Sequence, residues 1–99
     1  MENSAAKALS AIFGEKPALL KRIGGGAYGA IFLARLSSSS VCVKVFFRHG
    51  DAAREALWYR ALKMANVCLP HIFGERENCL VLEYIPGTKS GEEGAAVKV

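Results

Sequence analysis

The segment Val41-Cys42-Val43-Lys44-Val45-Phe46-Phe47 decides the fold of this chain, because its β-branched and aromatic residues are typical of a strand. Residues 52–65, which follow after a glycine and an aspartate, are nearly all strong helix formers. Lys44 is the one charged side chain of an otherwise apolar strand, so it needs an ionic partner or a route to water. A strand that carries a lysine and leads into a helix is therefore the centre of the predicted domain.

The residues before this strand predict a hairpin. Residues 18–23 have strand character, and residues 30–36 form a second apolar run that ends at a serine turn. Between them lies Gly24-Gly25-Gly26-Ala27-Tyr28-Gly29, which we expect to break any regular element. Upstream of the hairpin, residues 5–13 predict a short helix that is capped by Asn3 or Ser4.

The residues after the central strand predict a helix and two more strands. Asp51 is a good N-cap residue for the helix over 52–65. The short apolar runs at 71–73 and 79–85 are expected to be strands, separated by a polar turn over 74–78. We expect the helix to bury one broad apolar stripe, which comprises Leu57, Trp58, Ala61, Leu62 and Ala65.

Length and composition indicate one small domain. The chain has 99 residues, of which 52% are hydrophobic and 22% are charged, as in an ordinary folded protein. The order of elements predicts an α+β fold, in which a five-stranded antiparallel sheet carries one central helix and a short N-terminal helix. We divide the chain into an N-terminal helical extension (1–16), the sheet domain (17–88) and a C-terminal tail (89–99).

Several classes of function are disfavoured. There is no apolar run long enough for a membrane span, and the N-terminus does not resemble a secretory signal. Three irregularly spaced cysteines favour reduced thiols and a cytoplasmic location. The net charge of +4, without a basic cluster interleaved with aromatic residues, does not favour a nucleic-acid partner. Cys68 and His71 have metal-ligand spacing but lack a second close pair, so we expect no metal site.

The spacing Gly24-x-Gly26-x-x-Gly29 occurs in two unrelated nucleotide-binding folds, where it lets backbone amides approach phosphate groups. A dinucleotide fold needs a helix after the third glycine, and Arg48 would then receive the 2′-phosphate of NADP. The other fold needs a strand there and a lysine on the next strand, which is Lys44.

Glu55 is a candidate partner for Lys44. It lies on the flank of the predicted helix that also carries Trp58, Tyr59 and Leu62, and we expect this flank to face the sheet. If the two groups meet, each satisfies the other and the lysine keeps protons for phosphate oxygens. Alternatively, Lys44 reaches solvent from an edge strand and Glu55 is an exposed acid of the first helical turn.

Four segments in order resemble the protein-kinase-like superfamily. Residues 23–34 resemble its glycine-rich loop, Val41-Cys42-Val43-Lys44 resembles its strand-three signature, and residues 54–62 resemble its αC helix. Leu80-Val81-Leu82-Glu83-Tyr84-Ile85-Pro86-Gly87 resembles strand five and the hinge. The αC and hinge segments are as close to the aminoglycoside-phosphotransferase-like branch as to the protein kinases. The resemblance implies the amino-terminal, ATP-binding lobe.

By this resemblance, Gly24, Gly26 and Gly29 would cover the ATP phosphates, with Tyr28 at the tip of the loop. Lys44 would hold the α- and β-phosphates and pair with Glu55. The adenine pocket would use side chains that could equally be core residues of any fold, together with main-chain groups of the hinge. Its side chains would be Ile23, Ile31, Cys42 and Leu82, and its main-chain groups those of Glu83 and Ile85.

The same resemblance implies a catalytic base and magnesium ligands that these residues do not supply. The one aspartate, Asp51, has the position of a helix cap. We therefore expect an ATP-binding half that is truncated before the catalytic motifs and inactive alone, with a second polypeptide supplying or replacing the other lobe. The alternatives are a catalytically inert nucleotide-sensing or interaction module and, third, an NADP-binding fragment.

Overall fold

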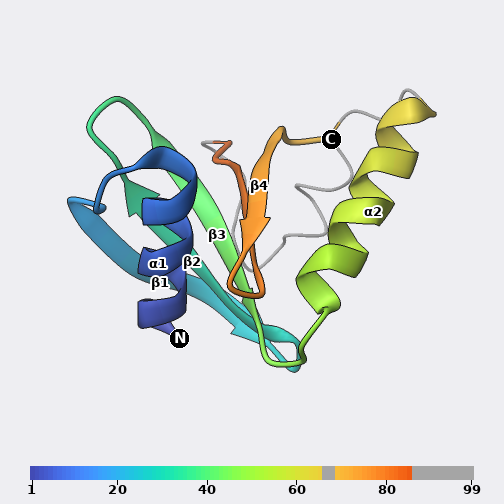
Figure 1. Cartoon of the computed structure of the whole chain (residues 1–99), viewed down its shortest axis with the longest axis horizontal. Helices are drawn as coiled ribbons and strands as arrows, with labels where there is room; N and C mark the ends of the chain where they lie inside the picture. Colours follow the sequence, from blue (N-terminus) through green and yellow to red (C-terminus); the bar gives the residue numbers. More distant parts are fainter. Residues whose placement is uncertain (66–68, 86–99) are drawn as a thin grey trace.

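The computed structural model describes residues 1–65 and 69–85, so the expected tail at 89–99 lies outside the described residues. Within these two ranges the chain forms two helices and five strands (Figure 1). They follow the order α1 (Glu2–Phe13), β1 (Leu19–Gly26), β2 (Gly29–Arg35), β3 (Ser40–Phe46), α2 (Asp51–Met64), β4 (Ile72–Arg76) and β5 (Cys79–Glu83).

The strands form one antiparallel sheet in the order β1-β2-β3-β5-β4, which confirms the predicted α+β fold. β3 is the central strand, so Lys44 does not lie on a sheet edge. Successive side chains of a strand point to opposite faces. Val41, Val43 and Val45 therefore share one face of the sheet, whereas Cys42, Lys44 and Phe46 share the other.

Helix α1 covers the face of the valines (Figure 1). Its residues Ala5, Ala8 and Leu9 are fully buried, at the three- and four-residue spacing that places side chains on one side of a helix. The helix also lies close to β4, where a Cβ atom on Gly74 would come within 2.9 Å of Ile12 Cδ1. The N-terminal segment is therefore packed against the sheet as part of the main core.

Helix α2 lies on the opposite face, but the predicted buried stripe is wrong. The helix buries Ala52, Ala56 and Tyr59, while Leu57 and Trp58 are 62% and 63% exposed. Because alanine is small, the helix backbone can lie close to Phe46, Leu80 and Leu82 of the sheet. Larger side chains at these helix positions would hold the helix farther away. Close approach to this sheet face, rather than maximal burial of apolar area, sets the rotation of α2.

The glycine-rich segment is more regular than its sequence suggests. β1 continues through Gly26 and β2 begins at Gly29, so Ala27 and Tyr28 alone connect the strands. Likewise β4 extends to Arg76, and the predicted turn at 74–78 shrinks to Glu77 and Asn78. In both hairpins, ladder hydrogen bonds between neighbouring strands override the local preference of glycine for irregular structure.

The predicted helix caps are also wrong. α1 begins at Glu2 with Met1 at the N-cap position, so Asn3 and Ser4 lie inside the helix. α2 begins at Asp51, and the N-cap position is taken by Gly50 in a left-handed conformation. Among the described residues, neither helix is long and apolar enough to cross a membrane.

Candidate functional site

Lys44 is the buried charge of the sheet. It lies in the middle of β3, with Ile31 of β2 and Leu80 of β5 opposite it in register. The residue is only 8% exposed, and it is the one charged residue in the buried core of the described chain. A buried ammonium group needs a counter-charge, so its partner determines what this face of the sheet can do.

Glu55 supplies that counter-charge. Its Oε2 accepts a hydrogen bond from Lys44 Nζ at 2.5 Å, so the contact expected from the sequence is present. Glu55 lies one helical turn after Asp51 and on the inward side of α2, beside Ala52, Ala56 and Tyr59. Its side chain is 29% exposed, so the pair lies at the boundary between core and solvent. Of the expected neighbours on this flank, Tyr59 is buried but Trp58 is not.

Tyr28 folds from the hairpin tip onto the same pair. Its ring centroid lies 5.6 Å from Lys44 Nζ, within the range of a cation–π contact, and 5.7 Å from that of the Phe46 ring. Its backbone carbonyl accepts a hydrogen bond from the Phe47 amide at 2.8 Å. The tip of the glycine-rich hairpin is thus attached to the end of β3, and Lys44 lies beneath it.

Two of the three motif glycines, Gly26 and Gly29, differ in their structural requirements. Gly29 has φ 155°, and a Cβ atom there would lie 1.8 Å from the carbonyl oxygen of Val45. The pairing of β2 with β3 alone therefore demands glycine at this position. At Gly26 a Cβ atom would make only an ordinary contact, 3.9 Å from the Tyr28 ring. A substitution at Gly26 can consequently separate a phosphate-binding role from a folding role.

Gly25, which the motif leaves unassigned, has its own structural requirement. Its φ is 156°, and a Cβ atom would lie 2.8 Å from the carbonyl oxygen of Gly29 and 2.7 Å from an Arg22 guanidinium nitrogen. The central glycine of the triplet thus serves the hairpin itself. The spacing of glycines in the sequence gave no sign of this difference.

The apolar residues assigned to an adenine pocket lie around the α2 face of the sheet. Cys42 pairs in register with Leu82 of β5, and Ile31 pairs with Lys44. Ile31 and Leu82 are buried and Cys42 is half-buried. Ile23 lies where the β1–β2 register shifts, at a bulge in β1. Ile31, Cys42 and Leu82 therefore lie on the sheet face of Lys44, although core packing accounts for Ile31 and Leu82 equally well, and the β1–β2 register does not place Ile23 among them.

The end of β5 leads into the segment expected to be the hinge. The Glu83 amide donates to the His71 carbonyl at 2.8 Å, and the Glu83 carboxylate accepts from the His71 amide at 3.0 Å. The amide of Glu83 is therefore already hydrogen-bonded within the protein. Ile85 follows at the end of the described range and is half-buried.

Burial keeps the thiol and phenol of this face in their neutral forms. Desolvation raises the pKa of Cys42 to about 11, which the positive charge of Lys44 only partly opposes. Desolvation raises the pKa of Tyr59 to about 12, with further contributions from the nearby Glu55 and Cys42. Cys42 and Tyr59 therefore add no charge beside the Lys44–Glu55 pair at neutral pH.

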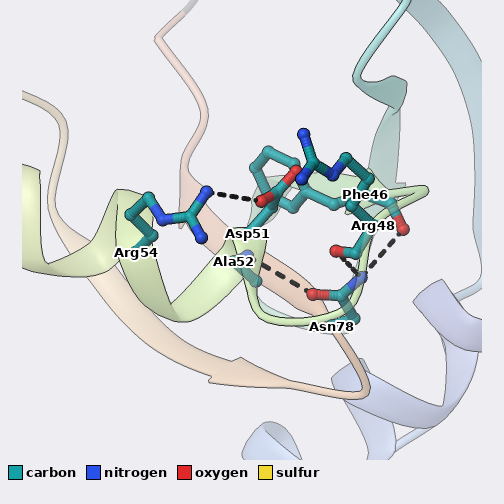
Figure 2. Close-up of polar contacts among 6 residues, drawn as sticks. All are labelled: Phe46, Arg48, Asp51, Ala52, Arg54 and Asn78. Carbon is teal, nitrogen blue, oxygen red and sulfur yellow. Dashed lines mark hydrogen bonds and ion pairs between the residues drawn. The ribbon is translucent and has the colours of Figure 1, made fainter.

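Asn78 is a residue of this region that sequence reasoning missed. It lies in the β4–β5 turn, and its side-chain amide bonds to Phe46, Arg48 and Ala52 (Figure 2). Figure 2 also shows Asp51 paired with Arg54 at 2.9 Å, which uses the aspartate expected to cap α2. The turn propensity of Asn78 was the only signal in the sequence, and it does not reveal contacts more than 25 residues away.

Comparisons with known proteins leave the family open. No family model matches the chain, and neither the curated proteins nor the solved structures contain a match to it. Among the described residues, no group of three or more His, Cys, Asp and Glu side chains is arranged to hold a metal ion. The functional assignment therefore depends on the geometry around Lys44.

Proposed function

We propose that this chain is the ATP-binding amino-terminal lobe of a kinase-like phosphotransferase. The observation that carries the proposal is the Lys44–Glu55 pair, which lies partly buried between the central strand and α2 and beneath a glycine-rich hairpin. A purely structural domain gains little from such a pair, because desolvating two charges costs about as much as their attraction returns. A lysine held by one carboxylate can still donate its remaining protons to phosphate oxygens.

In this proposal each part of the site has a separate task. Lys44 binds the α- and β-phosphates, and Glu55 fixes the direction of the ammonium group. The backbone near Gly24 and Gly26 covers the phosphates, since these positions carry no side chain to obstruct approach. Cys42 and Leu82 contact the adenine face, and the main chain of Glu83 and Ile85 binds its edge. Tyr28 moves away from Lys44 when phosphate enters.

Phosphoryl transfer needs groups that this lobe does not contribute. The single aspartate of the sequence is paired with Arg54 at the start of α2, so it is not placed to accept a proton from a substrate hydroxyl. Magnesium, bound with ATP, would neutralise phosphate charge, and residues 1–65 and 69–85 offer no cluster of side chains to hold it. The chain alone is expected to bind nucleotide weakly and not to transfer phosphate.

The test is a titration of the protein with MgATP, followed by amide chemical shifts, because this measurement detects weak binding. We expect shifts at Gly24 and Gly26 that are lost in Lys44→Met and retained in Lys7→Met, which removes the same charge from an exposed position on α1. Gly26→Ala should weaken binding without unfolding the protein. Equal binding by Lys44→Met and wild type would refute the proposal.

The NADP alternative is less consistent with the fold. A dinucleotide site needs a helix after the third glycine, whereas Gly29–Arg35 is strand β2. In the same titration, shifts caused by NADP but not by ATP would favour this alternative over ours.

One observation favours a second candidate, an interaction module that is not catalytic. The outward side of α2 exposes Leu57, Trp58 and Met64, the last at 87%. Exposed apolar side chains at neighbouring helical positions are typical of docking surfaces. If this were the main function, Trp58→Ala would abolish stabilisation by a partner protein and Lys44→Met would leave it unchanged.

A further inference from the structure

We propose that Asn78 is the positioning residue of the Lys44–Glu55 pair. Its Nδ2 donates to the carbonyl oxygens of Phe46 at 3.0 Å and Arg48 at 2.7 Å, and its Oδ1 accepts from the Ala52 amide at 3.3 Å. Figure 2 shows the three bonds converging on one side chain. A single amide from the β4–β5 turn thus joins the end of β3 to the start of α2.

These contacts lie next to both members of the pair. Phe46 is two residues after Lys44 on β3, and Ala52 is three residues, less than one turn, before Glu55 on α2. The connection between β3 and α2 contains Gly50, which has a left-handed conformation and no side chain to bond the first-turn amides. The Asn78 amide supplies that missing acceptor from another element, so it fixes where α2 begins relative to β3.

The chemistry of the site selects asparagine. Two carbonyl oxygens and one amide N–H converge on the side chain, so the site needs two donor hydrogens and one acceptor in a single planar group. Aspartate keeps the acceptor but places a carboxylate oxygen against two carbonyls. Glycine loses all three bonds. Serine is too short to reach all three partners.

Asn78 also has a simpler role as a turn residue, and a test must separate the two. Its φ is 57°, and the preceding Glu77 has φ 53°, so both residues adopt the left-handed conformation of a tight hairpin. Asparagine is favoured in this conformation for local reasons alone. Asn78→Gly tolerates the same backbone and removes only the amide, so it leaves the turn role intact. Glu77→Gly is the matched control, because Glu77 contributes none of the three bonds.

The experiment is a double-mutant cycle on urea unfolding. The coupling between positions 44 and 55 is measured with Lys44→Met, Glu55→Gln and the double variant, first in wild type and then in Asn78→Gly. We expect the coupling, expressed as a factor in the folding equilibrium constant, to fall to about one in Asn78→Gly and to persist in Glu77→Gly. Coupling that is unchanged in Asn78→Gly, with only a uniform loss of stability, would overturn the inference.

If Asn78→Gly does not fold, the same double-mutant cycle is measured in Asn78→Asp. This variant keeps the hydrogen bond from the Ala52 amide and loses the two hydrogen bonds donated to the carbonyl oxygens of Phe46 and Arg48. Persistent coupling in Asn78→Asp would contradict the inference, and lost coupling would support it.

A second measurement uses MgATP binding, and this part alone rests on the proposed function. If Asn78 acts through Glu55, Asn78→Gly should weaken binding about as much as Glu55→Gln, and the double variant should lose no more than Glu55→Gln. Additive losses would contradict the inference. Absence of MgATP binding by wild type would refute the proposed function, while the unfolding cycle would still test the role of Asn78.

Discussion

The two faces of the central strand bury side chains of different kinds, apolar on the α1 face and charged at Lys44 on the α2 face. On the α1 face, Val41, Val43 and Val45 join an apolar cluster with the helix. On the α2 face, Lys44 places a positive charge in the interior, and this charge is paired with the carboxylate of Glu55. One face of β3 stabilises the fold, whereas the other holds a charged pair whose net contribution to stability is small.

The helices show the same difference. α1 buries Leu9 completely, but α2 approaches the sheet with alanines and leaves Leu57 and Trp58 exposed. The helix on the side of the charged pair therefore leaves more of its large apolar side chains exposed to solvent than α1 does. This combination of a partly buried charged pair and a less apolar helix contact is the pattern that binding and catalytic sites commonly show, and it is consistent with the proposed function.

The largest expected effect is on the α1 face. Leu9→Ala removes a fully buried side chain and should destabilise the protein by about 2–5 kcal/mol, because it loses apolar burial and leaves a cavity. Leu57→Ala makes the same chemical change on the exposed side of α2 and should cost no more than about 0.5 kcal/mol. Urea unfolding of both variants measures the contrast, and equal losses would show that α2 is rotated from the orientation described.

An intermediate effect is expected at the charged pair. Glu55→Gln should destabilise the protein by about 1–3 kcal/mol, because it leaves the more deeply buried partner, Lys44, without a counter-charge. Lys44→Met should cost less, since the abandoned carboxylate is more exposed and methionine packs well in the core. Chemical denaturation at neutral pH measures the loss in unfolding free energy for each variant and shows which loss is larger. A larger loss for Lys44→Met would mean that the pair is a net source of stability.

A separate effect, caused by a change of conditions and not by a substitution, is expected at alkaline pH. The pKa values of Cys42 and Tyr59 on the α2 face are raised by burial to about 11 and about 12, from 9.0 and 10.0. Cys79 on the α1 face is likewise raised to about 11 from 9.0, by burial and by Glu77. Because the folded protein holds these protons more tightly, the contribution of these three groups to stability should be constant below pH 9 and fall between pH 9 and 12.

Thermal unfolding across this pH range measures the loss. Cys42→Ala should reduce the slope between pH 9 and 11, and Leu57→Ala, which changes no titrating group, should leave it unaltered. A stability that stays level up to pH 12 would contradict the assigned burial of these groups.

The elements themselves were predictable from local sequence. The β-branched run around Lys44 predicted β3, and the helix-forming residues after Asp51 predicted α2. The contact between Lys44 and Glu55 was expected from the helix flank that carries Glu55 and from the family resemblance. Such predictions succeed because strand and helix preferences are summed over several neighbouring residues. The glycine-rich hairpin was predicted less well, since pairing between strands extended β1 into the glycines.

The sequence by itself determined the order of elements and the antiparallel α+β class, because these depend on short-range propensity and on the alternation of strand-forming and helix-forming segments. It also nominated Lys44 and Glu55 as a pair. The tertiary structure decided which side of α2 is buried, which glycine the fold requires, and that Asn78 connects β3 to α2. Those features depend on contacts between segments that are distant in the chain. The space beside one element limits the size of the side chains that face it, and the polar backbone groups of that element need partners from elsewhere in the chain.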